Sequence, residues 1–347
     1  MTDLTAWGVP ARSDSAAEHY RVFAEHEARG SSPVYEEWAA AVADDSEVLA
    51  RIDALPRPKR QANLVFAAAR VAGVPVGPWA AARPELLARW PQVREVAMTH
   101  ATQTNEAARC AVLLPVLSAL PGPLALLEVG ASAGLCLYPD RYSYRYRTDA
   151  GETVVLEPSR PTDVVIDCDL SGTAPPPRLP EVAWRGGVDL HPLDAADPAT
   201  VDWLEALIWP EHGDRRDRLR AAARVAAADP VRLHAGDLSE RLDEVAASAP
   251  PEATLVVFHT AVLAYLTPDD RARFAERVAA LAAGRDGRVV WVSNEGLGVL
   301  PEVRDRLPAG AAGAGDFVLA VDGMPVAVTH PHGRTFRAVG RSAIIEG

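Results

Sequence analysis

Residues 126–135, reading LLEVGASAGL, join an apolar run to a glycine-rich turn that carries groups able to do chemistry. Gly130, Ser132 and Gly134 fit G-x-S-x-G, a pattern that places a nucleophilic serine on a sharp turn after a strand. Glu128, Gly130 and Gly134 equally fit E-x-G-x-x-x-G, in which glycine lets the backbone approach a cofactor because no Cβ intervenes. The string therefore predicts either attack by Ser132 on a carbonyl or a turn that lines a cofactor.

The elements before this string favour the cofactor turn. The first ~120 residues show helical spacing and no convincing alternating strand, so residues 124–129 are expected to form the first strand of the sheet. A hydrolase normally builds several strands before its nucleophile. Its triad would also need a downstream acid and then a histidine, an order that Asp322 followed by His330 or His332 satisfies. A serine hydrolase using Ser132 is therefore the alternative interpretation.

After residue 120, apolar runs alternate with helical segments, which predicts a sheet of mostly parallel strands covered on both faces. Strands are expected at 124–129, 142–146, 153–156, 164–166, 182–190, 231–234, 254–259 and 288–292. Helices are expected at 201–208, 215–228, 239–247 and 268–283, and a long helix at 93–120. Asp322-Gly323 predicts a hairpin between strands at 317–321 and 326–329.

These elements together predict an α/β fold. We expect a Rossmann-like, doubly wound, mostly parallel sheet with a C-terminal antiparallel hairpin and an N-terminal helical region. The predicted domains are a helical region at residues 1–120 and a Rossmann-like domain at 121–347, with a hairpin and loop inserted at about 138–180.

Composition limits the partners of this chain. A net charge of −12 argues against sequence-independent nucleic-acid binding, which needs a basic surface. No run approaches the ~20 apolar residues of a membrane span, and no apolar leader opens the sequence. Three widely spaced cysteines show no zinc pattern, and a turn is favoured over a metal site at His330 and His332. We expect a cytoplasmic protein with a small-molecule substrate and no bound metal.

Further motifs carry a resemblance to known families. With LLEVGASAGL, the strings YPDRYSYRY, GVDLHPLD, WPEH, VVFHTAVLAYL and THPHG resemble the uncharacterised bacterial family named domain of unknown function 2332, over most of the chain. LLEVGASAGL also resembles motif I of class I methyltransferases that use S-adenosylmethionine (SAM). That second resemblance implies a Rossmann-like sheet, a SAM cofactor and methyl transfer to a small-molecule acceptor.

The methyltransferase resemblance also implies roles for individual residues. The SAM turn would comprise Glu128, Gly130, Ala131, Ser132 and Gly134. Asp189, in GVDLHPLD, would bind the ribose hydroxyls. It lies about 60 residues past the turn, whereas in such enzymes this acid usually lies only about 20 residues past it. Asp167 and Asp169 are the competing candidates for that role. Asp237, after VRLHAG, matches the third-strand acid that contacts the adenine amino group.

For several other polar residues the sequence allows both a functional and a structural interpretation. His259 ends an apolar strand at the edge where open sheets bind ligands. It either takes a proton from the acceptor or is hydrogen-bonded within the sheet edge. Asn294-Glu295 either bind substrate or begin a loop, and the WPEH motif forms either a substrate lid or a capped loop. A non-catalytic Rossmann-like binding protein is the third functional class that fits.

Overall fold

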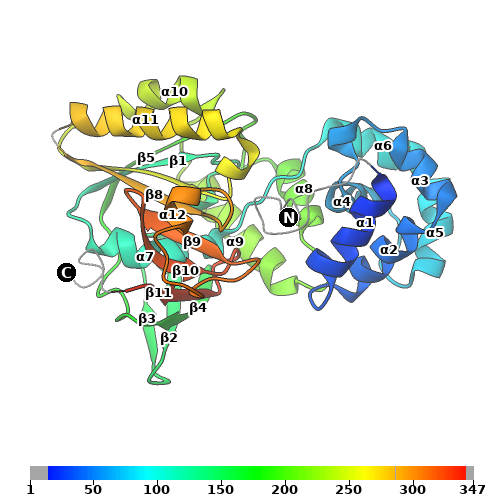
Figure 1. The fold of residues 1–347 in the computed structure, drawn as a ribbon, viewed down its shortest axis with the longest axis horizontal. Helices are drawn as coiled ribbons and strands as arrows, with labels where there is room; N and C mark the ends of the chain where they lie inside the picture. The colour runs from blue at the N-terminus through cyan, green and yellow to red at the C-terminus, as the bar shows by residue number, and fades with distance from the viewer. Residues whose placement is uncertain (1–14, 286, 341–347) are drawn as a thin grey trace. The chain divides into compact units, whose positions relative to one another are not determined.

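The structure is a computed structural model that describes residues 15–285 and 287–340. It contains two compact units. The helical unit comprises the described residues up to Thr104 together with Asp197–Asp217, and the sheet unit comprises Asn105–Ala196 and the described residues from Arg218 onward. Figure 1 follows both units along the chain by colour. Each unit is described by itself below.

The helical unit is built from short helices around an aromatic core. Its helices are α1 (Ala16–Val22), η1 (Phe23–Ala28), α2 (Pro33–Ala43), α3 (Ser46–Asp53), η2 (Arg57–Lys59), α4 (Ala62–Val71), α5 (Trp79–Ala88), α6 (Trp90–Thr99) and α8 (Pro198–Leu207). The rings of Tyr35 and Trp38 pack on Phe66, as do those of Tyr20 and Phe23. Their apolar area, removed from water, is the main source of stability for this unit.

The WPEH motif belongs to the helical unit as a capped loop. Glu211 accepts hydrogen bonds from Ser32 Oγ at 2.6 Å and from the Val34 N–H at 3.0 Å, so it occupies the N-terminus of α2. Trp209 donates its indole N–H to Asn63 Oδ1 at 2.9 Å. Both side chains therefore serve local structure, which is the second of the two interpretations of this motif.

The prediction of a single helix at 93–120 is wrong. α6 ends at Thr99, residues 100–106 carry no helix, and η3 (Ala107–Arg109) leads into α7 (Cys110–Ala119). Two tertiary contacts hold the connecting stretch: Trp203 donates its indole N–H to the Ala101 carbonyl, and the Asn105 side chain bonds the glycine turn of the sheet unit. The spacing of apolar residues carries no information about such long-range contacts. A prediction from spacing alone therefore makes the helix too long.

The sheet unit contains one mixed sheet, with eleven strands among the described residues. The strands are β1 (Leu124–Val129), β2 (Ser143–Thr148), β3 (Thr153–Leu156), β4 (Val165–Ser171), β5 (Val182–Asp189), β6 (Leu233–Ala235), β7 (Thr254–Thr260), β8 (Val289–Gly296), β9 (Phe317–Val321), β10 (Met324–Thr329) and β11 (Thr335–Ala338). Their order is β3-β2-β4-β11-β10-β9-β8-β7-β1-β5-β6. The five strands from β8 to β6 are mutually parallel.

The remainder of the sheet departs from the predicted pattern. The hairpin of β9 and β10 is confirmed, but β11 follows it and joins β4, so the hairpin lies inside the sheet. Four of the strand pairs are antiparallel, and the sheet is therefore mixed. β11, reading TFRA, escaped prediction because four residues of mixed polarity carry too little pattern.

Helices cover the sheet of this unit, although the strand–helix alternation is incomplete. α10 (Leu238–Ala246) contacts β1 and β5, and α11 (Pro268–Gly284) contacts α10 and β8. In Figure 1 these two helices lie above the strands, and α7 contacts β4. β1 is followed only by the 3₁₀ turn η4 (Leu135–Leu137) before the β2–β3 hairpin. No helix longer than η4 therefore lies between the glycine turn and β2.

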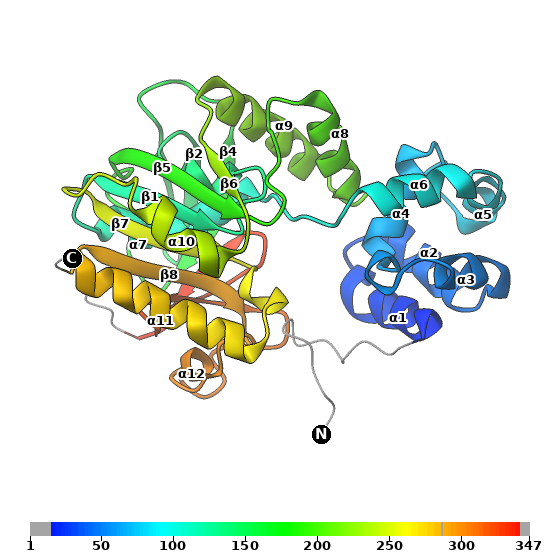
Figure 2. The same ribbon diagram turned by 90° about the horizontal axis from the view of Figure 1, so that it is seen from above.

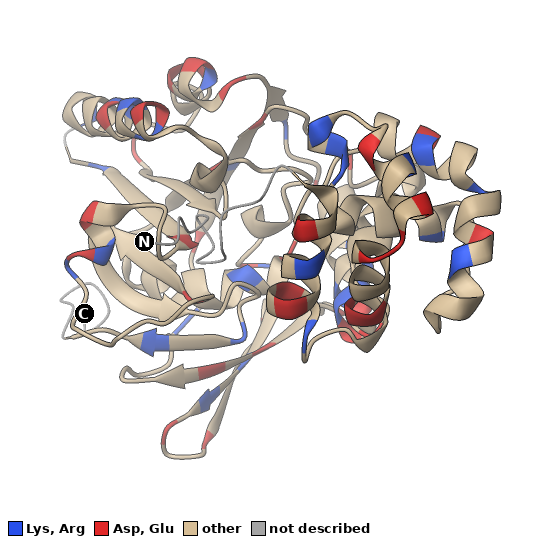
Figure 3. Cartoon of the chain, turned by 45° about the vertical axis from the view of Figure 1, so that its right-hand side comes forward, with Lys and Arg blue, Asp and Glu red and all other residues tan. Residues whose placement is uncertain are grey.

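The remaining helices and the core complete the sheet unit. α9 (Gly213–Ala228) begins in the helical unit and ends here; η5 (Leu263–Tyr265) and α12 (Pro301–Arg304) are short. Leu127, Val257 and Phe274 belong to the apolar core formed with α10 and α11, which Figure 2 shows side by side. Charged residues of both signs are interspersed on the helices (Figure 3). Among the helices described, none is long and apolar enough to cross a membrane.

Candidate functional site at the carboxyl edge of the sheet

The glycine turn directly follows β1 and is tightly packed. Gly130 and Gly134 have φ of +71° and +70°, the left-handed region that favours glycine. A Cβ on Gly130 would overlap the side chain of Val262. Ser132 also has a positive φ, +50°, and the Gly134 N–H closes the turn on the Ala131 carbonyl at 2.6 Å. The turn therefore requires glycine at the two positions that the sequence pattern selects.

Two side chains from distant segments hold this turn. Asn105 donates to Ser132 Oγ at 2.7 Å and accepts from the Ala133 N–H at 2.9 Å. Asp189, at the end of β5, accepts from the Ser132 N–H at 2.8 Å and from the His191 N–H at 2.8 Å. Parallel pairing of β1 with β5 brings the acid there despite its distance in sequence. Asp189 therefore lies at the turn, as expected of the second-strand acid.

The competing acids lie elsewhere in the sheet. Asp167 and Asp169 are exposed on β4, where they pair with Arg145 and Arg147. β4 is six strands away from β1, which at ~4.8 Å per strand is about 29 Å. Of the three candidate ribose acids, Asp189 is the one beside the turn.

Asp237 follows β6 and lies next to Asp189 along the sheet edge. The Gly236 N–H donates to the Asp189 carbonyl at 2.9 Å, which joins the ends of β5 and β6. The Asp237 carboxylate accepts from the Ser239 N–H at 2.8 Å and caps the N-terminus of α10. Asp237 thus lies at the end of the strand where the adenine-binding acid was expected, and its carboxylate forms a capping hydrogen bond.

Ser132 lacks a catalytic partner in this arrangement. Its Oγ accepts the Asn105 amide, and no imidazole of the described residues hydrogen-bonds to it. The positive φ of Ser132 suits a nucleophile turn. Such a turn is normally followed by a helix, whereas here only the short η4 follows. Among the described residues, no histidine is therefore placed to accept the proton of the Ser132 hydroxyl.

His259 is sealed inside the sheet edge. Its Nδ1 lies 2.6 Å from Glu295 Oε1, and Trp291 donates its indole N–H to Nε2 at 2.9 Å. His259 is 0% exposed, and both ring nitrogens are occupied. Because side chains alternate along a strand, His259 faces α11 and Phe274, opposite to Thr260 on the next position. The structure thus gives His259 the hydrogen-bonded role rather than access to a ligand.

Glu128 is a buried acid on the opposite face from His259. It pairs in register with Phe258, two positions from Thr260. Its side chain is 4% exposed, and Oε2 has no hydrogen-bond partner. Burial raises the pKa of this carboxyl well above its ordinary value, which the charge of Arg109 offsets only in part. Burial therefore favours the neutral form of the Glu128 carboxyl over its charged form.

The raised pKa of Glu128 makes stability depend on pH. The folded protein keeps this proton at pH values where the unfolded chain releases it, so stability falls as pH rises above the ordinary pKa of 4.5 toward the raised folded value. Glu128→Gln carries no ionisable proton. We expect the Tm of the variant minus the Tm of the wild type, measured by thermal unfolding, to increase as pH rises from about 4 to about 8. A difference that stays constant with pH would contradict this; exposed Glu240→Gln is the control.

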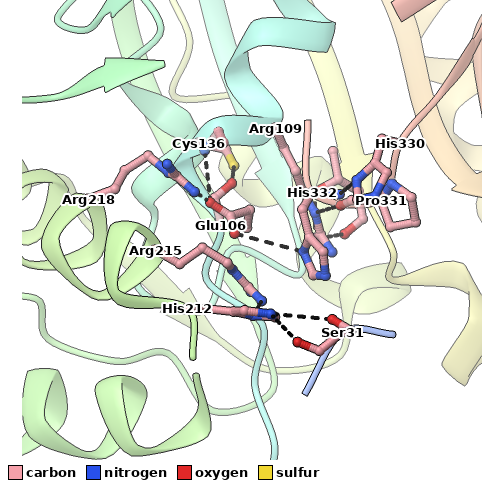
Figure 4. A network of polar contacts seen from close by, with 12 residues as sticks. Ser31, Glu106, Arg109, Cys136, His212, Arg215, Arg218, His330, Pro331 and His332 are labelled. Atoms are coloured by element: carbon pink, nitrogen blue, oxygen red, sulfur yellow. Dashed lines mark hydrogen bonds and ion pairs between the residues drawn. The ribbon is translucent and has the colours of Figure 1, made fainter. Parts of the chain in front are cut away.

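A second polar cluster lies at the same edge (Figure 4). Arg109 is 3% exposed and donates to the carbonyls of Pro331 and Thr260, while Glu106 is 4% exposed and pairs with Arg218 at 3.2 Å. β10 runs parallel to β8, so the THPHG loop after it reaches this edge. The string NEAAR, which contains Glu106 and Arg109, lies in the stretch predicted as a long helix, where Glu106 was expected either to reach the cofactor site or to face water.

The THPHG loop is fixed against this cluster. The His332 N–H donates to His330 Nδ1 at 3.0 Å, and His332 Nδ1 lies 3.8 Å from Glu106 Oε2. No group of three or more His, Cys, Asp or Glu side chains able to hold a metal ion occurs among the described residues. Figure 4 also draws His212 beside Ser31, a contact within the helical unit.

The described residues of the sheet unit line one cavity beside the glycine turn and another beside α10 and α11. One, of about 260 Å³, is lined by mostly small and apolar residues: Ala133, Tyr138, Pro192, Leu193, Asp194, Ala195, Ala196, Ala226, Ala227, Pro230, Val231 and Leu233. It lies beside the glycine turn. The other, of about 540 Å³, is lined by charged side chains of α10 and α11 and by Asp237. Ala133 of the glycine turn and the predicted adenine contact Asp237 thus line different cavities.

Comparison with known proteins places the chain in a family. Residues 17–337 match the model of the family described as "Uncharacterized protein conserved in bacteria (DUF2332)", and the chain belongs to this family. No curated protein and no solved structure matches it.

Proposed function

We propose that this protein binds SAM at the carboxyl edge of β1, β5 and β6 and transfers its methyl group to a small-molecule acceptor. The order of the parallel strands carries the proposal. Read along the sheet as β6-β5-β1-β7-β8, it is the 3-2-1-4-5 order of doubly wound sheets, which bind ligands where the order reverses. That point lies beyond β1 and β7, and the glycine turn stands there.

The residues at this edge fit such a cofactor. Each oxygen of Asp189 accepts one N–H and keeps a second lone pair, so a ribose hydroxyl can also donate to it. The cavity of about 260 Å³ beside Ala133 approaches the size of small-molecule pockets, ~300 Å³ and above. The unpartnered Oε2 of Glu128 offers a further polar contact at the end of β1.

The contribution of the chain to the reaction is mainly alignment. SAM, when bound, supplies a methyl group on a sulfonium, which an acceptor takes by in-line displacement. Holding donor and acceptor in line accounts for most of the rate in such a reaction. His259 takes no part in this proposal because both its ring nitrogens are engaged. Its expected role as a base is replaced by a structural one.

Calorimetric titration with SAM and S-adenosylhomocysteine tests the cofactor assignment directly. Asp189→Ala is a poor first variant, because it also removes the acceptor for the Ser132 N–H. A substitution that fills the cavity and leaves the turn intact is sharper. Absence of binding at millimolar concentration would overturn the proposal. Labelling of the wild type but not of Ser132→Ala by a fluorophosphonate would instead support the hydrolase alternative.

Ala227→Trp is expected to weaken S-adenosylhomocysteine binding by about tenfold or more. Ala227 is exposed on α9 and lines the cavity beside the turn, so an indole there occupies ligand space at little cost to the core. Ala280→Trp is the matched control, since Ala280 is an exposed helical alanine lining the other cavity. Calorimetry should show loss in the first variant and wild-type affinity in the second. The reverse result would move the cofactor to the cavity between α10 and α11.

A further inference from the structure

The cavity beside the glycine turn has a single charged side chain among the described residues that line it. The charge belongs to Asp194, and the other lining residues are alanine, proline, leucine, valine and Tyr138. The Tyr138 hydroxyl donates to the Asp229 carbonyl at 2.6 Å, so this side chain offers the cavity an apolar ring. A volume of about 260 Å³ with such a lining suits a compact, largely apolar group that has one polar edge.

One carboxylate oxygen of Asp194 is available to such a group. Oδ1 accepts the Ala196 N–H at 2.8 Å, and within the described part of the chain Oδ2 accepts no hydrogen bond. Asp197, three residues further on, uses both oxygens. Its Oδ1 accepts the Ala199 N–H and its Oδ2 accepts the Thr200 hydroxyl. Both acids close a local turn, but of the two it is Asp194 that keeps a free acceptor and lines the cavity.

The segment after β5 joins this acid to the glycine turn. Asp189 accepts the Ser132 N–H at 2.8 Å, and the Leu193 N–H donates to the Ser132 carbonyl at 2.9 Å. Asp194 directly follows Leu193 in the chain, as Ala133 follows Ser132. Both Asp194 and Ala133 line the cavity. A nucleoside whose ribose lies at Asp189 therefore has this cavity beside it for its base.

The acid that the methyltransferase resemblance selects for the base lies at the other cavity. Asp237 lines the cavity of about 540 Å³ together with charged side chains of α10 and α11. Its carboxylate caps α10 through the Ser239 N–H. Charged walls give a flat ring little apolar area to bury, whereas the walls beside Asp194 are mostly apolar. The lining of the two cavities therefore favours Asp194 over Asp237 as the contact of the base.

We propose that the cavity beside the glycine turn holds the adenine of the ligand and that Asp194 accepts a hydrogen bond from its exocyclic amino group. The inference rests on the proposed function for the choice of adenine among amino-bearing rings. Adenine has apolar faces for the alanine and proline walls and an N–H donor at its edge. A carboxylate can only accept, so it selects a ring with a donor there and discriminates against a ring without one.

Titration calorimetry with S-adenosylhomocysteine, adenosine and purine riboside tests this assignment. Purine riboside is adenosine without the exocyclic amino group. Asp194→Asn keeps an oxygen for the Ala196 N–H and places an NH2 group, a donor, where Oδ2 lies. We expect about tenfold or more loss in affinity for S-adenosylhomocysteine and adenosine, and no loss for purine riboside. Asp194 is exposed, so the variant should fold as the wild type does.

Two further variants serve as controls. Asp197→Asn changes an acid that also closes a turn but lines neither cavity, and it should keep wild-type affinity for all three compounds. Asp237→Asn should do the same. The assignment is overturned if Asp194→Asn leaves adenosine affinity unchanged, or weakens purine riboside as much as adenosine. Loss of the preference for adenosine in Asp237→Asn would return the adenine to the acid after β6.

The same titrations separate this inference from the proposed function. A wild type that prefers adenosine through Asp194 but binds neither SAM nor S-adenosylhomocysteine keeps the base site and overturns the proposed function. A wild type that binds S-adenosylhomocysteine with equal affinity in Asp194→Asn keeps the proposed function and overturns the base site. Absence of binding by all of these compounds overturns both.

Discussion

Gly333→Ala is expected to destabilise the sheet unit by roughly 3 to 5 kcal/mol, the sum of a strained backbone and an overpacked contact. Gly333 has φ +71°, and a Cβ there would overlap the Ala108 carbonyl. That obstacle is backbone, which cannot rotate away as a side chain can. Relief requires the THPHG loop to separate from η3, and with it the Arg109 contact to Pro331.

Urea unfolding followed by tryptophan fluorescence measures this loss. Gly151→Ala is the matched control, because Gly151 has φ +77° and nothing within 4 Å of a Cβ. It should cost about 1 kcal/mol, from the dihedral alone. Equal losses in the two variants would mean that the Gly333 contact carries no strain beyond its φ.

Glu295→Ala is expected to cost about 3 to 5 kcal/mol, because it leaves buried donors without their acceptor. Glu295 Oε1 accepts from His259 Nδ1 at 2.6 Å and from the N–H groups of Val262 and Leu263 at 2.9 and 3.1 Å. The carboxylate is 2% exposed, so water cannot replace it. It therefore ties the ends of β7 and β8 to the segment entering η5.

Glu295→Gln is the control for this second variant. Its amide oxygen still accepts hydrogen bonds, so a loss of less than about 1.5 kcal/mol is expected from chemical unfolding. If alanine and glutamine cost the same, the hydrogen bonds to Oε1 do not stabilise the edge. Unchanged ligand binding in the glutamine variant would agree with a structural His259–Glu295 pair.

Local pattern was sufficient for most strands of the sheet unit. β1 and β7 contain the apolar runs LALL and LVVF, and the turn at Asp322-Gly323 predicted the β9–β10 hairpin. Positive φ at Gly130 and Gly134 agrees with the glycine turn. Such features depend on residues near in sequence, which is why one chain suffices to predict them.

Features that depend on distant partners were missed or wrong. The stretch at 100–106 has apolar neighbours of helical spacing, but Asn105 turns its amide to Ser132 and Ala133. β11 exists because β10 and β4 flank it. Arg109 lies in the stretch predicted as one long helix, and its contacts with Thr260 of β7 and Pro331 of the THPHG loop come from segments distant in sequence.

The sequence by itself determined where the strands and the glycine turn form, because hydrophobic spacing and backbone sterics act over a few residues. Tertiary structure decided which polar groups meet. Strand order excluded Asp167 and placed Asp189 at the turn, while the alternation of side chains turned His259 away from Glu128. Long-range pairing and burial, rather than residue type, brought the charge of Arg109 near Glu128 and raised the pKa of that acid.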